Sequence, residues 1–311
     1  MSAAREMRSE FDYETLAADL HVPARAEVLL SEYTTLKVGG PAAWFFEPRT
    51  SSEAATLFAA LCEGPLPVRV LGGGSNLIVA DRGVRAAVVH TGRMHAEPQQ
   101  QSSQLVRVPA GLPVPGLARW AQRQGLAGLE FAEGIPAQVG GAIRMNAGAN
   151  GSWFGEICCD VAVVGPSGVV EHRRVSPSDF SYRDSFVARE RLFVLEAVLR
   201  LGVDEPAEIK QRLVRYRDRR RSSQPLQDRS AGCAFANWSD LSAGKLIEQL
   251  GLKGMSIGDA VVSPVHGNFI VNRGNATAHD VLTLIDTVRE TMERESGRVA
   301  RIEVEIWRDE S

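Results

Sequence analysis

The chain has 311 residues, of which 44% are apolar and 23% are charged, and its net charge is −3. This mixture is typical of a globular protein with more than one domain, and the slight negative charge gives no electrostatic argument for a nucleic-acid partner. No apolar run approaches membrane-spanning length, and the N-terminal residues mix charges without an apolar core. We therefore expect a cytoplasmic protein that does not insert into a membrane.

The first predicted elements alternate between strands and helices. Residues 1–21 form a charged lead-in without an assigned role. The segment 33–48 ends in a predicted strand bounded by Pro48. Thr50 and Glu53 have the spacing of a capping box and predict the start of an amphipathic helix. A short strand over 68–70 should then deliver the chain into a glycine-rich loop.

Short β-branched runs dominate the middle of the chain. One helix is predicted over 113–124, and a polar hairpin or loop over 99–104. The predicted strands cover residues 84–90, 105–108, 161–164, 169–174 and 192–201. Short strands mixed with few helices favour an α+β fold over a doubly wound parallel sheet.

A domain boundary is expected near residues 202–206, before a helix over 209–221. This helix ends in a cationic run over 215–221. Such runs are usually solvated helix faces, which is the favoured interpretation here, and attraction of an anionic substrate or of the NADPH phosphates is the alternative.

The C-terminal residues predict one more helix and one more strand. Thr277 should cap the helix, and Gly297 should end it. Residues 301–307 alternate in polarity, so they predict a terminal strand with Glu303 and Glu305 on the same side.

The four cysteines are Cys62, Cys158, Cys159 and Cys233. They show neither C-x-x-C spacing nor histidines at metal-site intervals, so no metal site is predicted. Adjacent Cys158 and Cys159 are expected to act as small apolar residues in or near a strand.

Two glycine-rich stretches, residues 71–79 and 134–151, are the most distinctive feature of the sequence. Glycine lets backbone N–H groups approach a ligand closely, and runs of such groups form concave anion sites. The longer stretch contains too much glycine for an ordinary helix or strand. Neither stretch is a nucleoside-triphosphate loop or a G-x-G-x-x-G motif. On these residues alone, tight turns and a ligand cradle are equally good interpretations.

Taken together, the two stretches resemble a known family. Gly-Gly-Gly-Ser-Asn-Leu over 72–77 and Gly-Ile-Pro-x-x-Val-Gly-Gly-Ala-x-x-Met-Asn-Ala-Gly over 134–148 are similar to the flavin-binding half of the UDP-N-acetylenolpyruvoylglucosamine reductases. The resemblance continues through Tyr182-Arg183-Asp184-Ser185 and Ser230-Ala231-Gly232-Cys233-Ala234-Phe235. It runs from about residue 34 to the end of the chain, and it points to the shorter, type II form.

The resemblance implies a fold and a domain organisation. Residues 22–202 would form an FAD-binding domain of the PCMH type, which is vanillyl-alcohol-oxidase-like, with two subdomains that meet near residues 66–70. Residues 203–311 would form a smaller α+β substrate-binding domain. Both parts are compatible with the α+β pattern described above.

The resemblance also implies the reaction and the cofactors. NADPH would reduce a non-covalently bound FAD, which would pass hydride to the enolpyruvyl group of a UDP-sugar during peptidoglycan precursor synthesis. The partners would be small molecules, without nucleic acid. The implied FAD-binding residues are Gly72, Gly73, Gly74, Ser75, Asn76, Leu77, Gly134, Ile135, Gly140, Gly141, Asn146, Ala147 and Gly148.

Three catalytic residues are implied by matching motifs. Arg183 would bind the substrate carboxylate, because a guanidinium can make two parallel hydrogen bonds. Cys233 would donate a proton to the α-carbon, and a free thiol is mostly protonated at neutral pH. Glu305 aligns with the catalytic glutamate of the family, and it should be protonated or hydrogen-bonded to Arg183. Glu303 is the alternative to Glu305.

Each of these residues also has a structural interpretation. Arg183 could be a surface arginine paired with Asp179 or Asp184, and Cys233 could be a small buried residue in a turn. The resemblance favours the catalytic interpretation of both.

The implied substrate-binding residues are Tyr182, Asn237 and Lys253. The chain departs from the family at Ala236 and Trp238, where a lysine and a proline are common after the Phe. Because that lysine could meet a diphosphate, this departure concerns substrate affinity more than the reaction class. Asn150 also stands where Tyr is common.

Two other functions are compatible with the same motifs. One is a different oxidase of the flavoprotein superfamily, many of which attach flavin covalently through a residue near the first glycine loop. His90 and His95 lie too far along the chain to favour this attachment. The other is a non-catalytic nucleotide-binding relative, against which Arg183, Cys233 and Glu305 together argue.

Overall fold

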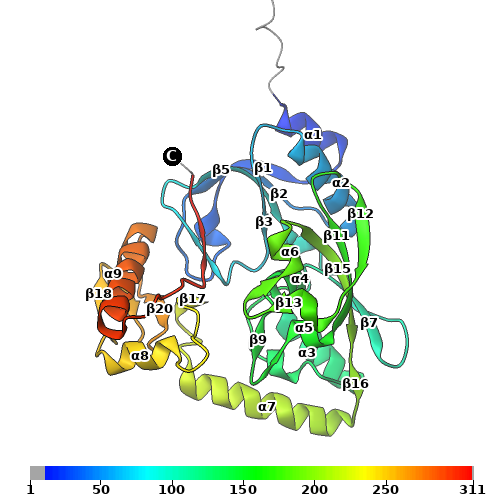
Figure 1. The fold of residues 1–311 in the computed structure, drawn as a ribbon. Coiled ribbons are helices and arrows are strands. Elements are labelled where there is room, and N and C mark those ends of the chain that lie inside the picture. The colour runs from blue at the N-terminus through cyan, green and yellow to red at the C-terminus, as the bar shows by residue number, and fades with distance from the viewer. Residues whose placement is uncertain (1–10, 310–311) are drawn as a thin grey trace, which may run out of the picture.

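A computed structural model describes residues 11–309 and shows three packed bodies (Figure 1). The first, blue to cyan in Figure 1, contains a four-stranded sheet in the order β1-β2-β5-β3. In it β2, β5 and β3 are parallel, and β1 runs antiparallel to β2. Its elements are α1 (Tyr13–Asp19), β1 (Ala24–Leu29), β2 (Pro41–Phe46), α2 (Ser51–Cys62), β3 (Val68–Leu71), β4 (Leu77–Val79) and β5 (Val84–His90).

The second body, cyan to green in Figure 1, is built on a five-stranded antiparallel sheet in the order β12-β11-β15-β7-β6. Helices α3 and α4 contribute buried residues to the same core as this sheet. Its elements are β6 (Gln99–Gln100), β7 (Leu105–Pro109), α3 (Val114–Arg123), β8 (Leu126–Ala127), α4 (Val139–Arg144), β9 (Gly148–Ala149), β10 (Ser152–Trp153), α5 (Phe154–Ile157), β11 (Cys158–Val164), β12 (Val170–Arg174), β13 (Phe180–Ser181), β14 (Asp184–Ser185), α6 (Phe186–Arg189), β15 (Phe193–Arg200) and β16 (Gly202–Val203).

The third body, yellow to red in Figure 1, has a four-stranded sheet in the order β17-β20-β19-β18 with its own apolar core. Helix α7 runs along one side of the molecule from the second body to the third (Figure 1). The elements are α7 (Pro206–Ser223), β17 (Arg229–Cys233), α8 (Ala243–Gln249), β18 (Ser256–Ile257), β19 (Ala260–Val262), β20 (Phe269–Asn272), α9 (Ala278–Ser296) and β21 (Glu305–Trp307).

Several predicted element ends are confirmed, because they depend on local hydrogen bonds. The side chain of Thr50 accepts a hydrogen bond from the Glu53 N–H and begins α2. Thr277 caps α9, and Gly297 ends it in the left-handed conformation that glycine favours. The α+β fold is confirmed as well.

Two local predictions are wrong. Residues 301–307 are not one alternating strand, because the chain bends at Val304 and β21 begins only at Glu305. The second glycine stretch is not free of regular structure, since Val139–Arg144 forms the short helix α4. The N–H groups that begin this helix are satisfied by carbonyls of Leu112 and Ala110, so the helix forms despite its glycines.

The C-terminal body is attached to the first body at several places. Strand β21 pairs in parallel with β4, so the end of the chain returns to the first body. The carboxylate of Asp81 accepts the N–H groups of Ala278 and His279 at 2.7 and 2.9 Å, at the positive end of α9. Asn272 donates to the Leu36 carbonyl. These contacts fix the two parts relative to each other; the boundaries at residues 21 and 202 stay predictions.

In residues 11–309, no helix combines the length and the apolar character needed to span a membrane.

Candidate active site

A cavity of about 1420 Å³ lies where the three bodies meet. This is larger than most small-molecule sites, as a dinucleotide together with a second ligand requires. The predicted residues that line it are Gly72, Gly73, Gly74, Ser75, Asn76, Leu77, Ile135, Gly140, Gly141, Ala147, Gly148, Arg183, Cys233 and Glu305. Both glycine stretches therefore face one space.

The two glycine stretches approach each other closely. A Cβ atom on Gly73 would lie 3.3 Å from the carbonyl oxygen of Pro136, whereas one on Gly141 would meet nothing within 4 Å. The N–H groups of Gly73, Gly74 and Ser75 donate no hydrogen bond to another described residue. Unpaired N–H groups on a concave surface suit an anionic diphosphate, so this part of the cavity fits the pyrophosphate of FAD.

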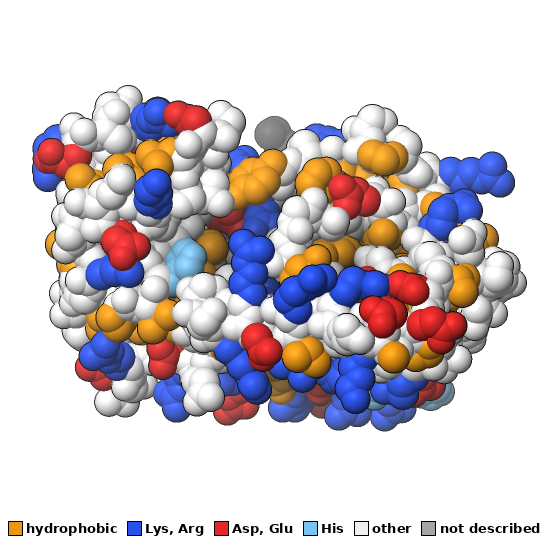
Figure 2. All heavy atoms as spheres, turned by 90° about the horizontal axis from the view of Figure 1, so that it is seen from below, with side chains coloured by type: hydrophobic (Ala, Val, Ile, Leu, Met, Phe, Trp, Pro, Cys, Tyr) orange, Lys and Arg blue, Asp and Glu red, His pale blue; other side chains and the backbone are white. Residues whose placement is uncertain are grey.

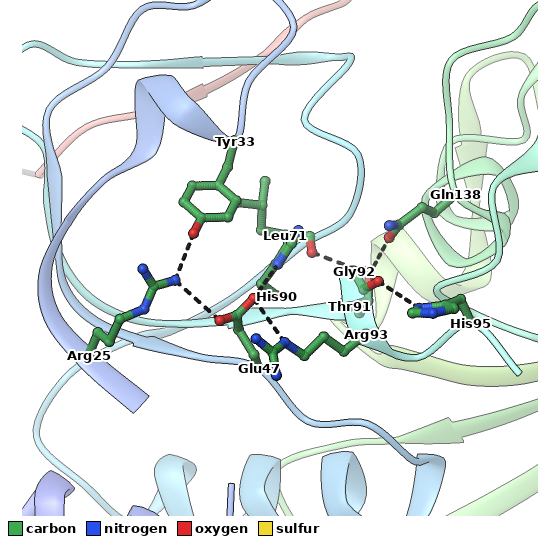
Figure 3. Close-up of polar contacts among 10 residues, drawn as sticks. All are labelled: Arg25, Tyr33, Glu47, Leu71, His90, Thr91, Gly92, Arg93, His95 and Gln138. Carbon is green, nitrogen blue, oxygen red and sulfur yellow. Dashed lines mark hydrogen bonds and ion pairs between the residues drawn. The ribbon is translucent and has the colours of Figure 1, made fainter. Parts of the chain in front are cut away.

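Figure 3 shows the polar contacts that connect the first body to the second glycine stretch. The hydroxyl of Thr91, the residue after β5, donates to the Gln138 side chain and joins the first body to the second glycine stretch. Beside it the buried carboxylate of Glu47 is surrounded by Arg25, His90 and Arg93, at 3.2 to 3.6 Å. Neither His90 nor His95 is among the residues that line the cavity. Covalent attachment of flavin through either histidine therefore has no support.

Cys233 is placed at the cavity by tight contacts between β17 and the first glycine loop. The Thr35 hydroxyl donates to the Ser230 carbonyl at 2.6 Å, and the Thr35 N–H donates to the Gly74 carbonyl at 3.1 Å. Burial raises the pKa of the Cys233 thiol to about 12, and the carboxylate of Glu303 acts in the same direction. The thiol is therefore protonated at neutral pH.

Arg183 lies beside Cys233 in a strained conformation. Its φ angle is +57°, in the left-handed region that residues other than glycine rarely adopt. Its Nε donates to Glu303 Oε1 at 2.6 Å, and its terminal nitrogens donate no hydrogen bond within the described residues. Asp184 pairs instead with Arg189. The surface pairing of Arg183 with Asp179 or Asp184 is thus wrong.

The hydrogen-bond partners of Glu303 and Glu305 differ from those expected from the sequence. Glu303 is the carboxylate bonded to Arg183, whereas Glu305 accepts from Arg144 at 2.6 Å and from the Trp307 indole at 2.9 Å. Of the two expectations for Glu305, a protonated carboxyl or a bond to Arg183, the bond is wrong. The two glutamates have different partners because the chain bends at Val304, which lies between them. The Glu303 N–H donates to the Ala234 carbonyl, whereas the Glu305 N–H donates to the Asn76 carbonyl. Both side chains still line the cavity.

Some predicted ligand contacts do not reach the cavity. The Asn146 amide is buried and bridges the backbone of Ser181 and Gly155, so it shapes the loop instead of lining the cavity. Gly134 packs against the side chain of Arg220 and does not line the cavity. Lys253 pairs with Glu248 at 2.8 Å and is not a lining residue either.

Tyr182 and Asn237 lie together outside the cavity lining. The Tyr182 hydroxyl is 3.5 Å from Glu303 Oε2 and accepts the Asn237 N–H at 3.3 Å. The family departures Ala236 and Trp238 also lie outside the lining, where Trp238 donates to the Val299 carbonyl.

The cationic run is not simply a solvated face. Arg217 pairs with the buried Glu133, and both Arg219 and Arg220 line the cavity. Burial lowers the pKa of Arg220, and within the described residues its Nε has no hydrogen-bond partner. Figure 2, seen from the side of α7, shows basic side chains across the middle of this face. The pattern of the run did not distinguish these inward-facing arginines.

Arg144 and Gln224 were also missed by the sequence analysis, and both line the cavity. Arg144 is the only charged residue within the second glycine stretch, which was the signal that could have identified it. Gln224 has a buried side-chain oxygen without a partner in the described part of the chain.

This fold and this cavity define an FAD-dependent oxidoreductase. Residues 42–173 match the model of an FAD binding domain, and residues 224–307 match the C-terminal domain of UDP-N-acetylenolpyruvoylglucosamine reductase. The chain belongs to the UDP-N-acetylenolpyruvoylglucosamine reductase family.

Individual relatives support this membership. The chain is 42% identical to the reductase of Heliobacterium modesticaldum over 90% of this chain and 89% of that protein. It is 40% identical to the reductase of Bacillus subtilis, over 89% and 91%. The crystal structure of the Thermus caldophilus reductase superposes with a TM-score of 0.78 at 39% identity, covering 92% of this chain and 99% of the other.

Proposed function

We infer that the chain reduces UDP-N-acetylglucosamine enolpyruvate to UDP-N-acetylmuramate, with FAD as cofactor and NADPH as hydride donor, in peptidoglycan precursor synthesis. The observation that carries this inference is the meeting of Cys233 and Arg183 at one cavity with the two glycine stretches. The partners are then small molecules, and the place of action is the cytoplasm, without nucleic acid or membrane insertion.

The N–H groups of Gly73, Gly74 and Ser75, with the open surface at Gly141, would hold FAD without a covalent bond. Bound FAD, reduced by NADPH, supplies hydride to the β-carbon of the enolpyruvyl ether. The side chains then have two tasks, which are to stabilise negative charge on the substrate and to deliver a proton.

Arg183 is suited to the first task. Hydride addition places negative charge on the α-carbon and carboxylate of the substrate. The terminal nitrogens of Arg183 are free within the described residues, and together they can bind a carboxylate through two parallel hydrogen bonds. The partly buried position of the guanidinium strengthens such a bond.

Cys233 is suited to the second task because its thiol keeps its proton at neutral pH. In this step the S–H bond breaks, and the electron pair of the substrate's α-carbon forms the new C–H bond. The positive charge of Arg183 would stabilise the thiolate that remains.

We propose that Glu305 is the third catalytic residue, as its motif implies. A lone carboxylate would repel the charge that develops on the substrate. Here Arg144 lies 2.6 Å away and balances the charge of Glu305, which reduces this repulsion.

We propose that Arg220 binds the diphosphate of the UDP-sugar. A buried cation without a partner is costly, and an anionic ligand removes this cost. Arg220→Met should raise KM for the UDP-sugar by roughly ten- to a hundredfold with little change in kcat, because a hydrogen bond to a charged group contributes about 1.5–3 kcal/mol. Steady-state kinetics with each substrate varied in turn measure this effect.

Arg215→Met is the matched control, since Arg215 is exposed on the same helix and does not line the cavity. An equal rise in KM in both variants would contradict the diphosphate site. A rise in KM for NADPH alone would assign Arg220 to the nucleotide donor.

The experiment that tests the function follows flavin colour without oxygen. NADPH should bleach the purified yellow protein, and UDP-N-acetylglucosamine enolpyruvate should restore the colour, whereas UDP-N-acetylglucosamine should not. Acid precipitation should release the flavin into the supernatant. Colour restored by neither sugar would contradict the proposed reaction, and absence of flavin would favour the non-catalytic alternative.

A further inference from the structure

The first body contains a buried carboxylate that is surrounded by basic side chains. Glu47, the residue after β2, is 9% exposed. Arg25 lies 3.2 Å from one carboxylate oxygen, and His90 and Arg93 lie 3.5 and 3.6 Å from the other (Figure 3). A buried carboxylate is costly unless its partners compensate it. None of these four residues lines the cavity, so they can act on a ligand there only through other residues.

One side of this cluster leads to the first glycine stretch. Arg25 Nη2 pairs with Glu47 and also donates to the Tyr33 hydroxyl at 2.7 Å. The Tyr33 backbone lies directly behind Gly74, because a Cβ atom on Gly74 would lie 2.1 Å from the Tyr33 carbonyl oxygen. The Gly74 carbonyl accepts the Thr35 N–H at 3.1 Å. The loop whose N–H groups face the cavity therefore packs against a segment that Arg25 and Glu47 hold in place.

The other side of the cluster leads to the second glycine stretch. The His90 ring packs against the rings of Tyr33 and Phe45, with centroid distances of 5.0 and 5.3 Å. The next residue, Thr91, donates its hydroxyl to the side chain of Gln138, which is the N-cap residue of α4. His90 therefore connects the cluster to the point where the second glycine stretch enters α4.

We propose that Glu47 is a positioning residue, which fixes the two glycine stretches in the arrangement that FAD requires before FAD binds. The stretches belong to different bodies and must keep a constant separation around one cofactor. The contacts that support them converge at Glu47 (Figure 3). A site that is arranged in advance binds more tightly, because less ordering opposes binding. The proposal deepens the cofactor part of the proposed function and rests on it for the identity of the ligand.

The dissociation constant of FAD tests this role. Glu47→Gln keeps the size of the side chain and removes its charge. FAD release from the diluted holoenzyme, measured by ultrafiltration, should give a Kd that is roughly ten- to a hundredfold higher, which is the usual effect of losing a hydrogen bond to a charged group. This measurement does not depend on catalysis. An unchanged Kd would overturn the proposal.

Glu130→Gln is the matched control for the loss of a buried charge. Glu130 is 6% exposed and pairs with Arg212 at 2.9 Å, and neither residue lines the cavity. The control should lower the melting temperature in saturating FAD but leave the Kd of FAD unchanged. An equal rise in Kd in both variants would show a general loss of stability and would contradict the positioning role.

Tyr33→Phe tests the same connection with a smaller change, also in the case that Glu47→Gln does not fold. It removes only the hydroxyl that accepts from Arg25, and Tyr33 does not line the cavity. The Kd of FAD should rise about threefold or more. In the double variant the two effects on the free energy of FAD binding should add up to less than their sum, because both changes break one connection. A wild-type Kd in Tyr33→Phe, or fully additive effects, would contradict the connection through Arg25.

The same measurement separates this proposal from the proposed function. A wild-type protein that binds no FAD would contradict the proposed function. Equally tight binding of FAD by the wild type and by every variant would contradict only the role of Glu47.

Discussion

Replacement of Cys233 by alanine should block the second half of the reaction and leave the first half intact. NADPH should bleach the flavin at a rate near that of the wild type, because Cys233 has no role in that step. Reoxidation by the UDP-enolpyruvyl sugar should fall by about a hundred- to ten-thousandfold, which is the usual contribution of a general acid. Without the proton, the substrate anion can return its hydride. Anaerobic stopped-flow absorbance measures both half-reactions separately.

Cys233→Ser should recover part of the rate, because a hydroxyl carries a transferable proton but is a weaker acid. Cys62→Ala is the matched control, since Cys62 does not line the cavity. Reoxidation of Cys233→Ala within a few-fold of wild type would remove the assignment and leave water or another side chain as the acid.

Arg183→Ala should lower kcat by about a hundredfold or more, the effect of losing one donor that stabilises transition-state charge. The charge that Arg183 binds grows during hydride transfer, so the effect should appear in kcat and in kcat/KM. Flavin reduction by NADPH should stay near normal. Arg183→Lys should recover little, since an ammonium cannot replace two parallel hydrogen bonds. Steady-state kinetics, combined with the same stopped-flow assay, measure these effects.

Arg189→Ala serves as the control, because Arg189 is a nearby arginine that pairs with Asp184 and does not line the cavity. If Arg183→Ala changes only KM, Arg183 binds the substrate equally well before and during the reaction, and its proposed catalytic role is wrong.

The separate carboxylates of Glu303 and Glu305 connect these predictions. Glu303 lies with Arg183 and Cys233, whereas Glu305 lies with Arg144 and the first glycine loop. Any effect of Glu305→Gln on reoxidation should therefore occur without a change in Cys233 reactivity. The two glutamates would then contribute to the same step through different arginines.

The sequence by itself determined features that depend on near neighbours. Thr50 and Thr277 begin their helices, and Gly297 ends the last one, because each acts within one helical turn. Through the family resemblance, the two glycine stretches predicted the cofactor loops, and the structure places residues of both along one cavity. Matching motifs also placed Arg183 and Cys233 among the candidates, and the structure brings both to the cavity.

Only the tertiary structure decided which side chains meet. The pairing of Arg183 with Glu303 joins residues that are 120 positions apart, so no local pattern could predict it. The arginines over 215–221 share the same composition signal. Packing of α7 against the second body decides that Arg219 and Arg220 are the ones that line the cavity. The bend at Val304 separates two glutamates that strand alternation would place together. In each case the physical reason is that contacts between distant segments, not near neighbours, set the direction of the side chain.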